Sequence, residues 1–155
     1  MWPAITQRTV WNWQNNAESL GVDAIAAIPP IYFHLPEHAI AAYWNAMSAA
    51  APNTDFIIYN IPQLAGVALT QGLFAQMRRN PRVIGVKNSS MPVQDIQMFK
   101  AEAMKTRQDF IVFNGPDEQL VSGLAMGADG GSRRYLRSHA GAVFKVYMSW
   151  CRKTG

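Results

Sequence analysis

The stretch R-V-I-G-V-K-N-S-S, residues 82–90, is the part of the chain that decides the fold. Val83, Ile84 and Val86 are β-branched and apolar, which is typical of a parallel strand that is buried on both faces. The strand then reaches Lys87 and becomes polar. Desolvation at such a position favours the neutral amine, the form that attacks a ketone to make a Schiff base. The alternative is a strand-end lysine whose ammonium group reaches solvent.

Strand and helix patterns alternate on both sides of this stretch. Helices are predicted at residues 9–20, 36–51, 70–79, 93–104 and 118–126, and further strands at 22–28, 55–59 and 109–113. The strands start at intervals of roughly 27–32 residues, close to the length of one βα unit, and this favours an all-parallel sheet. A (β/α) barrel has its active site at the carboxyl ends of its strands, and the candidate catalytic and binding residues of this chain follow its predicted strands. A doubly wound sheet is the alternative, but no Gly-rich dinucleotide motif follows a first strand.

Composition limits the functional class. The chain has 155 residues, of which 49% are hydrophobic and 15% charged, as in a globular domain. The net charge of +4 comes largely from the last quarter, and no basic stripe carries interleaved aromatic residues, so no nucleic-acid partner is expected. A single cysteine indicates a reducing compartment, and no apolar run approaches the ~20 residues of a membrane span. With no signal-peptide pattern at the N-terminus, we expect a cytoplasmic protein without a membrane partner.

Tyr59 follows the strand that precedes the Lys87 strand. Neighbouring strands of a parallel sheet lie about 5 Å apart, so we expect the two side chains to converge. A phenol beside an amine can shuttle a proton while a carbinolamine forms and breaks down. The alternative role for Tyr59 is an aromatic cap on the core.

Five ordered motifs resemble one enzyme family. They are I-P-P-I-Y-F at 28–33, Y-N-I-P-x-x-x-G at 59–66, G-V-K-N-S-S at 85–90, F-N-G-P-D-E at 113–118 and G-A-D-G-G at 127–131. In this order and spacing they resemble the dihydrodipicolinate synthase / N-acetylneuraminate lyase family of class I aldolases. The resemblance implies a partial TIM (β/α)8 barrel, roughly strands 4–8 with their helices.

The resemblance also implies catalytic roles. Lys87 is similar to the lysine that forms a Schiff base with pyruvate or another 2-oxo acid, and Tyr59 to the tyrosine that transfers protons. Tyr32 matches an aromatic residue that lies at the site or reaches towards a neighbouring subunit. This chemistry needs no cofactor beyond the covalent Schiff base, and no ligand spacing in the sequence fits a metal site.

Substrate binding is implied for the motif after the fourth predicted strand. Gly115, Asp117 and Glu118 match the residues that hold the hydroxylated tail of a sugar acid in sialate lyases. Two carboxylates and an open backbone suit such a polyol. The alternative is a solvated acidic turn ahead of a helix. The expected partner is a small-molecule 2-oxo acid, and the family is usually homo-oligomeric.

Leu64 favours one branch of the family. Dihydrodipicolinate synthases carry an arginine at that position, two residues after the proline of Y-N-x-P, whereas an apolar residue is more like the sugar-acid lyases. The resemblance therefore predicts cleavage of a 2-oxo sugar acid such as N-acetylneuraminate to pyruvate and an aldehyde. Two alternatives stay open: an inactive fragment or half-barrel interaction module of the same family, and condensation of pyruvate with an aldehyde.

Two features depart from the family pattern. Its members are about twice as long, so we interpret this chain as truncated, with residues 1–131 as a partial barrel domain. The family continues G-A-D-G-G with I-G-x-T-Y, whereas this chain continues S-R-R-Y-L-R. Plausible codons for 133–137, shifted by one nucleotide, encode Gly-Gly-Thr-Tyr-Gly. As a hypothesis, residues 132–155 are a divergent tail that is partly out of frame.

Overall fold

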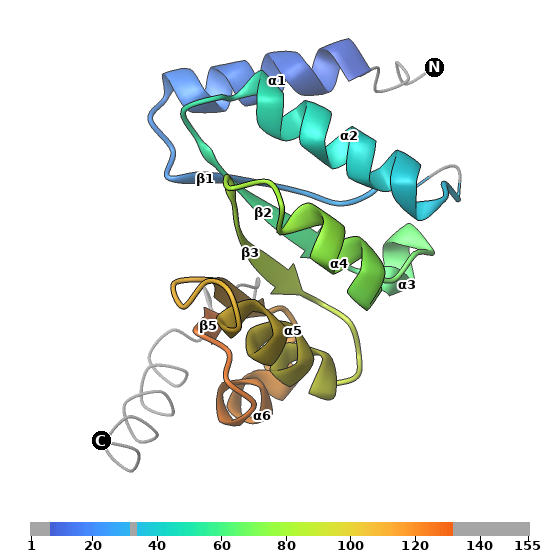
Figure 1. Cartoon of the computed structure of the whole chain (residues 1–155), viewed down its shortest axis with the longest axis vertical. Helices are drawn as coiled ribbons and strands as arrows, with labels where there is room; N and C mark the ends of the chain where they lie inside the picture. The colour runs from blue at the N-terminus through green and yellow to red at the C-terminus, as the bar shows by residue number, and fades with distance from the viewer. Residues whose placement is uncertain (1–6, 32–33, 132–155) are drawn as a thin grey trace. The chain divides into compact units, whose positions relative to one another are not determined.

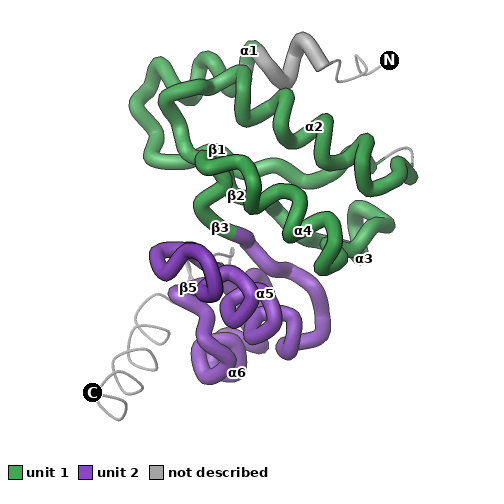
Figure 2. The backbone as a smooth tube through the Cα atoms, in the orientation of Figure 1, with its two compact units in different colours: residues 1–85 green, residues 86–155 purple. Residues whose placement is uncertain are grey.

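The computed structural model of the protein describes residues 7–31 and 34–131. The five strands take the order β1-β2-β3-β4-β5 in a parallel α/β sheet, which is also their order in the chain. The chain divides into two compact units, residues 1–85 and 86–155, as Figure 2 shows. The predicted partial (β/α) barrel is confirmed in this order of strands and helices (Figure 1). The predicted tail at 132–155 lies outside the described residues.

The first unit contains helices and strands that alternate along the chain. Its elements are α1 (Gln7–Ser19), β1 (Ala24–Ala27), α2 (Glu37–Ala50), β2 (Asp55–Asn60), α3 (Pro62–Ala65), α4 (Gln71–Met77) and the start of β3 (Val83–Asn88). The short helix α3 is the element that the sequence pattern does not predict. It is only one turn long, begins with Pro62 and is followed by Gly66, whose φ of 68° is left-handed and closes the turn.

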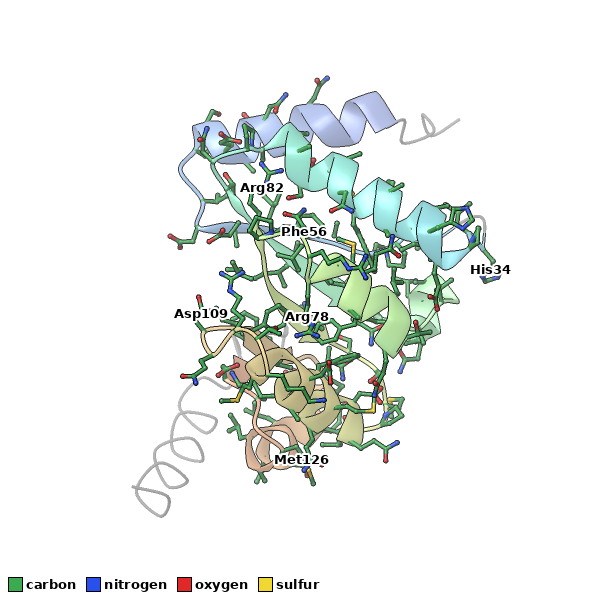
Figure 3. All side chains as sticks on the ribbon, viewed as in Figure 1. His34, Phe56, Arg78, Arg82, Asp109 and Met126 are labelled. Carbon is green, nitrogen blue, oxygen red and sulfur yellow. The ribbon has the colours of Figure 1, made fainter. Side chains whose placement is uncertain are left out.

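Apolar spacing explains the core of this unit. Helix α2 buries Ile40, Trp44 and Met47, which recur every three or four residues and so share one face. Strand β2 alternates, and Phe56 and Ile58 are fully buried. The Phe56 amide donates to the carbonyl of Arg82 at 2.8 Å, so β3 starts alongside β2 (Figure 3, where Phe56 and Arg82 are labelled).

The second unit contains the rest of β3 and the elements that follow it. These are α5 (Gln94–Met104), β4 (Ile111–Asn114), the 3-10 turn η1 (Asp117–Gln119), α6 (Leu120–Ala125) and β5 (Gly130–Gly131). The sequence pattern predicts one helix from 118 onwards, whereas the structure has η1 first and then α6. Two-residue β5 pairs in parallel with the end of β4.

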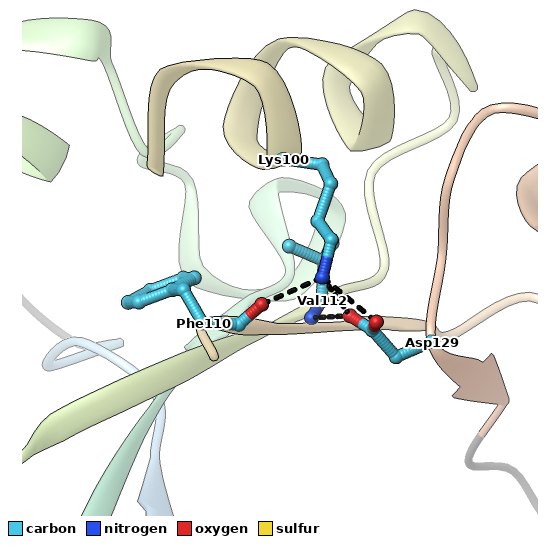
Figure 4. A network of polar contacts seen from close by, with 4 residues as sticks. All are labelled: Lys100, Phe110, Val112 and Asp129. Atoms are coloured by element: carbon cyan, nitrogen blue, oxygen red, sulfur yellow. Dashed lines mark hydrogen bonds and ion pairs between the residues drawn. The ribbon is translucent and has the colours of Figure 1, made fainter. Parts of the chain in front are cut away.

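A polar network connects α5, β4 and the residue before β5 (Figure 4). Lys100 Nζ donates to the carbonyl of Phe110 at 2.8 Å and lies 2.7 Å from Asp129 Oδ1. The other carboxylate oxygen of Asp129 accepts the amide hydrogen of Val112 at 2.7 Å. Each buried backbone group needs a hydrogen-bond partner, and β5 is too short to pair with the start of β4. The network supplies partners there for the Phe110 carbonyl and the Val112 amide.

Among the described residues, no helix is both long and apolar enough to cross a membrane.

Candidate active site

Lys87 is the penultimate residue of β3. The strand is buried on both faces, as predicted, because Val83 and Val86 are 1% and 0% exposed. Lys87 itself is half-buried, between fully buried Val86 and buried Asn88. Its backbone is therefore held by the core on both sides of the residue, while its long side chain can extend beyond the strand.

The loop after β3 packs tightly on the loop after β4. The Gly115 amide donates to the carbonyl of Asn88 at 2.7 Å, and Gln119 Nε2 donates to the carbonyl of Met91 at 2.8 Å. A Cβ at Gly115 would overlap the Ser89 hydroxyl and lie 2.8 Å from the Asn88 carbonyl oxygen. Only glycine fits this approach, which explains why the motif F-N-G-P-D-E has Gly115 at that position. Two of the sequence motifs are thus in direct contact inside the second unit.

The two predicted carboxylates lie in η1, directly after this glycine. Asp117 is half-buried and Glu118 is exposed. Pro116 precedes the turn in an extended conformation, with a ψ of 124°. The carboxylates therefore follow the same loop that contacts the Asn88 carbonyl, and they lie a few residues from the carboxyl end of β4. This arrangement offers carboxylate oxygens as hydrogen-bond acceptors, which can bind hydroxyl groups.

Tyr59 belongs to the first unit, where it is the penultimate residue of β2 and half-buried. The next residue, Asn60, is 3% exposed, and its Oδ1 accepts the Leu69 amide hydrogen at 3.0 Å. That bond ties the end of β2 to the segment that leads into α4. Tyr59 and Lys87 thus have the same position in consecutive strands. Predicted Tyr32 lies outside the described residues.

A repeated feature that we did not predict from the sequence is an asparagine at the end of three strands. Asn60, Asn88 and Asn114 are the last residues of β2, β3 and β4, and each is at most 3% exposed. Each side chain bonds within its own strand-to-helix connection: Asn60 to the Leu69 amide, Asn88 to Ser90 Oγ and Asn114 to the carbonyl of Pro116. The repeated pairs Y-N, K-N and F-N, at the ends of three of the four predicted strands, are the signal that could have identified them.

In residues 7–31 and 34–131, no three His, Cys, Asp or Glu side chains are grouped as a metal site would require. The three lysines in these ranges have different surroundings. Lys100 is held by Asp129 and the Phe110 carbonyl, and Lys105, directly after α5, pairs with Glu102 of that helix. Only Lys87, among these three, lies at the carboxyl end of a strand.

Comparisons with known proteins give one family. Residues 5–142 match the Dihydrodipicolinate synthetase family. The chain is 76% identical over 133 residues to the N-acetylneuraminate lyase of Mediterraneibacter gnavus, which covers 86% of this chain and 40% of that protein. It is 32% identical over 114 residues to the N-acetylneuraminate lyase of Lactiplantibacillus plantarum, covering 74% of this chain and 37% of that protein.

Solved structures agree with these matches. The wild-type sialic acid aldolase of Ruminococcus gnavus superposes with a TM-score of 0.76 at 68% identity, covering 81% of this chain and 41% of that one. A catalytic lysine mutant of the same aldolase gives the same TM-score. CdNal from Clostridium difficile, solved in complex with mannosamine, gives 0.73 at 27% identity, covering 82% of this chain and 42% of that one. The chain spans about two fifths of the length of these relatives.

Proposed function

We propose a function from the fact that this chain belongs to the Dihydrodipicolinate synthetase family. The proposal is that it is the Schiff-base part of an aldolase that cleaves a 2-oxo sugar acid to pyruvate and an aldehyde. N-acetylneuraminate is the proposed substrate, because the relatives at 76% and 32% identity are N-acetylneuraminate lyases. The observation that carries the proposal is the position of Lys87 at the end of β3, next to a loop that supplies two carboxylates.

Lys87 is the proposed nucleophile. Sialic acid aldolase of Ruminococcus gnavus has a catalytic lysine, and of the three lysines among the described residues Lys87 is the one at the carboxyl end of a strand. The neutral amine of Lys87 adds to the ketone carbon of the substrate. Loss of the ketone oxygen as water then leaves an iminium ion, which can accept the electron pair of the bond between its α and β carbons.

Tyr59 is the proposed proton shuttle. Its phenol gives a proton to the departing hydroxyl of the carbinolamine and is left as a phenolate. The phenolate can next take the proton of the substrate hydroxyl on the β carbon, which becomes the aldehyde oxygen. The bond between the α and β carbons of the iminium ion then breaks, and the β carbon leaves as the aldehyde. The electron pair of the broken bond stays with the α carbon and forms an enamine. Protonation of the enamine and hydrolysis of the imine release pyruvate and restore the amine.

Gly115, Asp117 and Glu118 are the proposed binding residues for the hydroxylated tail of the sugar acid. Support comes from their loop, which contacts the residue after Lys87 through the Gly115–Asn88 hydrogen bond. Carboxylates accept hydrogen bonds from hydroxyl groups, so this loop is suited to a polyol and not to a second anion. Tyr32 keeps its proposed place at the site or at a contact with a neighbouring subunit, since members of the family are usually homo-oligomeric. The reaction is proposed to need no cofactor beyond the covalent Schiff base between the substrate and Lys87.

The decisive experiment is reductive trapping. The purified chain is incubated with pyruvate and borohydride, digested and examined by mass spectrometry, with Lys87→Ala as the matched variant. We expect a reduced pyruvyl adduct on the peptide that contains Lys87 and none on those that contain Lys100 or Lys105. Release of pyruvate from N-acetylneuraminate then tests the substrate. A folded chain that gives no adduct would contradict the proposal, and condensation with aspartate semialdehyde instead of cleavage would contradict the choice of reaction.

A further inference from the structure

A chain of three side chains extends from the end of β3 to the start of α5. Asn88 Nδ2 donates to Ser90 Oγ at 2.9 Å, and Ser90 Oγ donates to Asp95 Oδ2 at 2.6 Å. Asn88 and Ser90 are 1% and 4% exposed, and Asp95 is half-buried. None of these three residues is assigned a role in the proposed reaction.

The charge at Asp95 fixes the direction of both hydrogen bonds. An ionised carboxylate only accepts, so it takes the single hydroxyl hydrogen of Ser90. The Ser90 oxygen must then accept from its other neighbour, which sets the amide of Asn88 with its nitrogen towards Ser90. Asp95 lies in the first turn of α5, where the helix dipole favours a negative charge. Consecutive bonds of this kind strengthen each other in a buried setting.

Asn88 is the link between this chain of side chains and the candidate site. Its backbone directly follows Lys87, and its carbonyl accepts the Gly115 amide hydrogen. The side chain of Asn88 is therefore held from the α5 side and its backbone from the β4 side. A rotation of Asn88 would move both the last peptide of the lysine strand and the loop that begins with Gly115.

We infer that Asp95 is a positioning residue, which acts through Ser90 and Asn88 to hold Lys87 and the 115–118 loop in a fixed relation. The inference rests on the proposed function of Lys87 and deepens it. Asp95 touches neither substrate nor the reacting amine. The competing explanation is that Asp95 only stabilises the first turn of α5 through its charge, in which case its loss lowers stability without changing the Asn88–Gly115 contact.

Two measurements separate these explanations. The variants are Asp95→Asn, which keeps the shape and removes the charge, and Ser90→Ala, which removes the link. Asp109→Asn is the matched control, because Asp109 is an exposed aspartate of the same unit whose partner is Arg107. The first readout is the amide hydrogen exchange of Gly115, with the Phe56 amide as reference in the other unit. The second is reductive trapping on Lys87 as a function of pyruvate concentration.

Asp95→Asn and Ser90→Ala are expected to accelerate Gly115 exchange by at least about fivefold. They should also lower the rate of trapping at saturating pyruvate more than they change the half-saturating concentration. Unchanged Gly115 exchange in both variants would overturn the inference. So would accelerated exchange with trapping kept at the rate of the unaltered chain. If the unaltered chain gives no adduct, the proposed function fails and Lys87 needs no positioning, while the Gly115 exchange still decides whether Asp95 holds this loop.

Discussion

Asp129 and Val112 are joined by two hydrogen bonds of opposite direction. The Asp129 amide donates to the Val112 carbonyl at 2.9 Å, and the Asp129 carboxylate accepts the Val112 amide hydrogen at 2.7 Å. The side chain thus replaces a neighbouring strand on one side of β4. Lys100 neutralises this carboxylate from α5, where its own side chain is 17% exposed. Three elements of the second unit consequently depend on one ion pair.

Replacement of Lys100 by methionine should destabilise the second unit. The change keeps most of the side-chain volume but leaves Asp129 without its cation and the Phe110 carbonyl without its donor. A lost hydrogen bond to a charged group costs about 1–3 kcal/mol, which urea unfolding can measure. Lys105→Met is the control: its ammonium pairs with Glu102, but the side chain is 68% exposed, so the loss should stay below about 0.5 kcal/mol. Equal effects of the two variants would contradict the structural role of the network.

Tyr43 should make the chain sensitive to alkaline pH. Burial of this phenol in α2 raises its pKa above the ordinary value of 10.0. The unfolded chain therefore loses the Tyr43 proton at a lower pH than the folded chain does. The stability that this difference provides is fully present below the unfolded pKa and is lost as the pH rises through the folded pKa. Urea unfolding should show a smaller alkaline loss in Tyr43→Phe than in the unaltered chain, and identical losses would contradict the prediction.

The sequence predicts the order of the long elements because their apolar periods are local. Strand β3 is recognisable from its run of β-branched residues, and α2 from the spacing of Ile40, Trp44 and Met47. The one-turn helix α3 and the two-residue strand β5 are too short to have a period, so patterns cannot identify them. The order of the motifs predicts that Lys87 and Gly115 lie at strand ends. The contact of Gly115 with Asn88, and the bonds from Asn88 to Asp95, depend on the three-dimensional packing of two loops and have no one-dimensional signature.

Two helical glycines should respond in opposite ways to alanine. At Gly72 in α4, a Cβ would meet Glu37 Oε2 at 3.5 Å, which is ordinary contact, so Gly72→Ala should stabilise by about 0.5 kcal/mol through lower backbone entropy of the unfolded chain. At Gly123 in α6, a Cβ would lie 2.6 Å from Asn114 Oδ1. Asn114 is 1% exposed and bonded to Pro116, so it cannot yield easily. Gly123→Ala should cost about 1–3 kcal/mol.

A double-mutant cycle tests the cause of the Gly123 effect. In an Asn114→Ala background the clash is absent, so Gly123→Ala should then cost far less than it does alone. The same cost in both backgrounds would show that the approach of α6 to the end of β4 is not the reason. Urea unfolding of the four proteins gives the comparison.

Gly115→Ala should separate the two loops of the candidate site. A Cβ there would overlap the Ser89 hydroxyl and lie 2.8 Å from the backbone carbonyl oxygen of Asn88, which cannot rotate away as a side chain would. The hydrogen bond from the Gly115 amide to that carbonyl must lengthen or break. We expect a loss of about 2–3 kcal/mol in stability and at least a tenfold lower rate of pyruvate trapping on Lys87.

Gly130→Ala is the matched control for Gly115→Ala in the same unit. A Cβ at Gly130 would lie 3.6 Å from the ring of Phe113, an ordinary contact, so both stability and trapping should stay near those of the unaltered chain. Ser89→Ala combined with Gly115→Ala removes the hydroxyl overlap but keeps two contacts at 2.8 Å, with the Cβ of residue 89 and with the Asn88 carbonyl oxygen. Trapping should therefore stay low in the combined variant. Its full recovery would show that the Ser89 hydroxyl, and not the backbone contact between the loops, sets the geometry around Lys87.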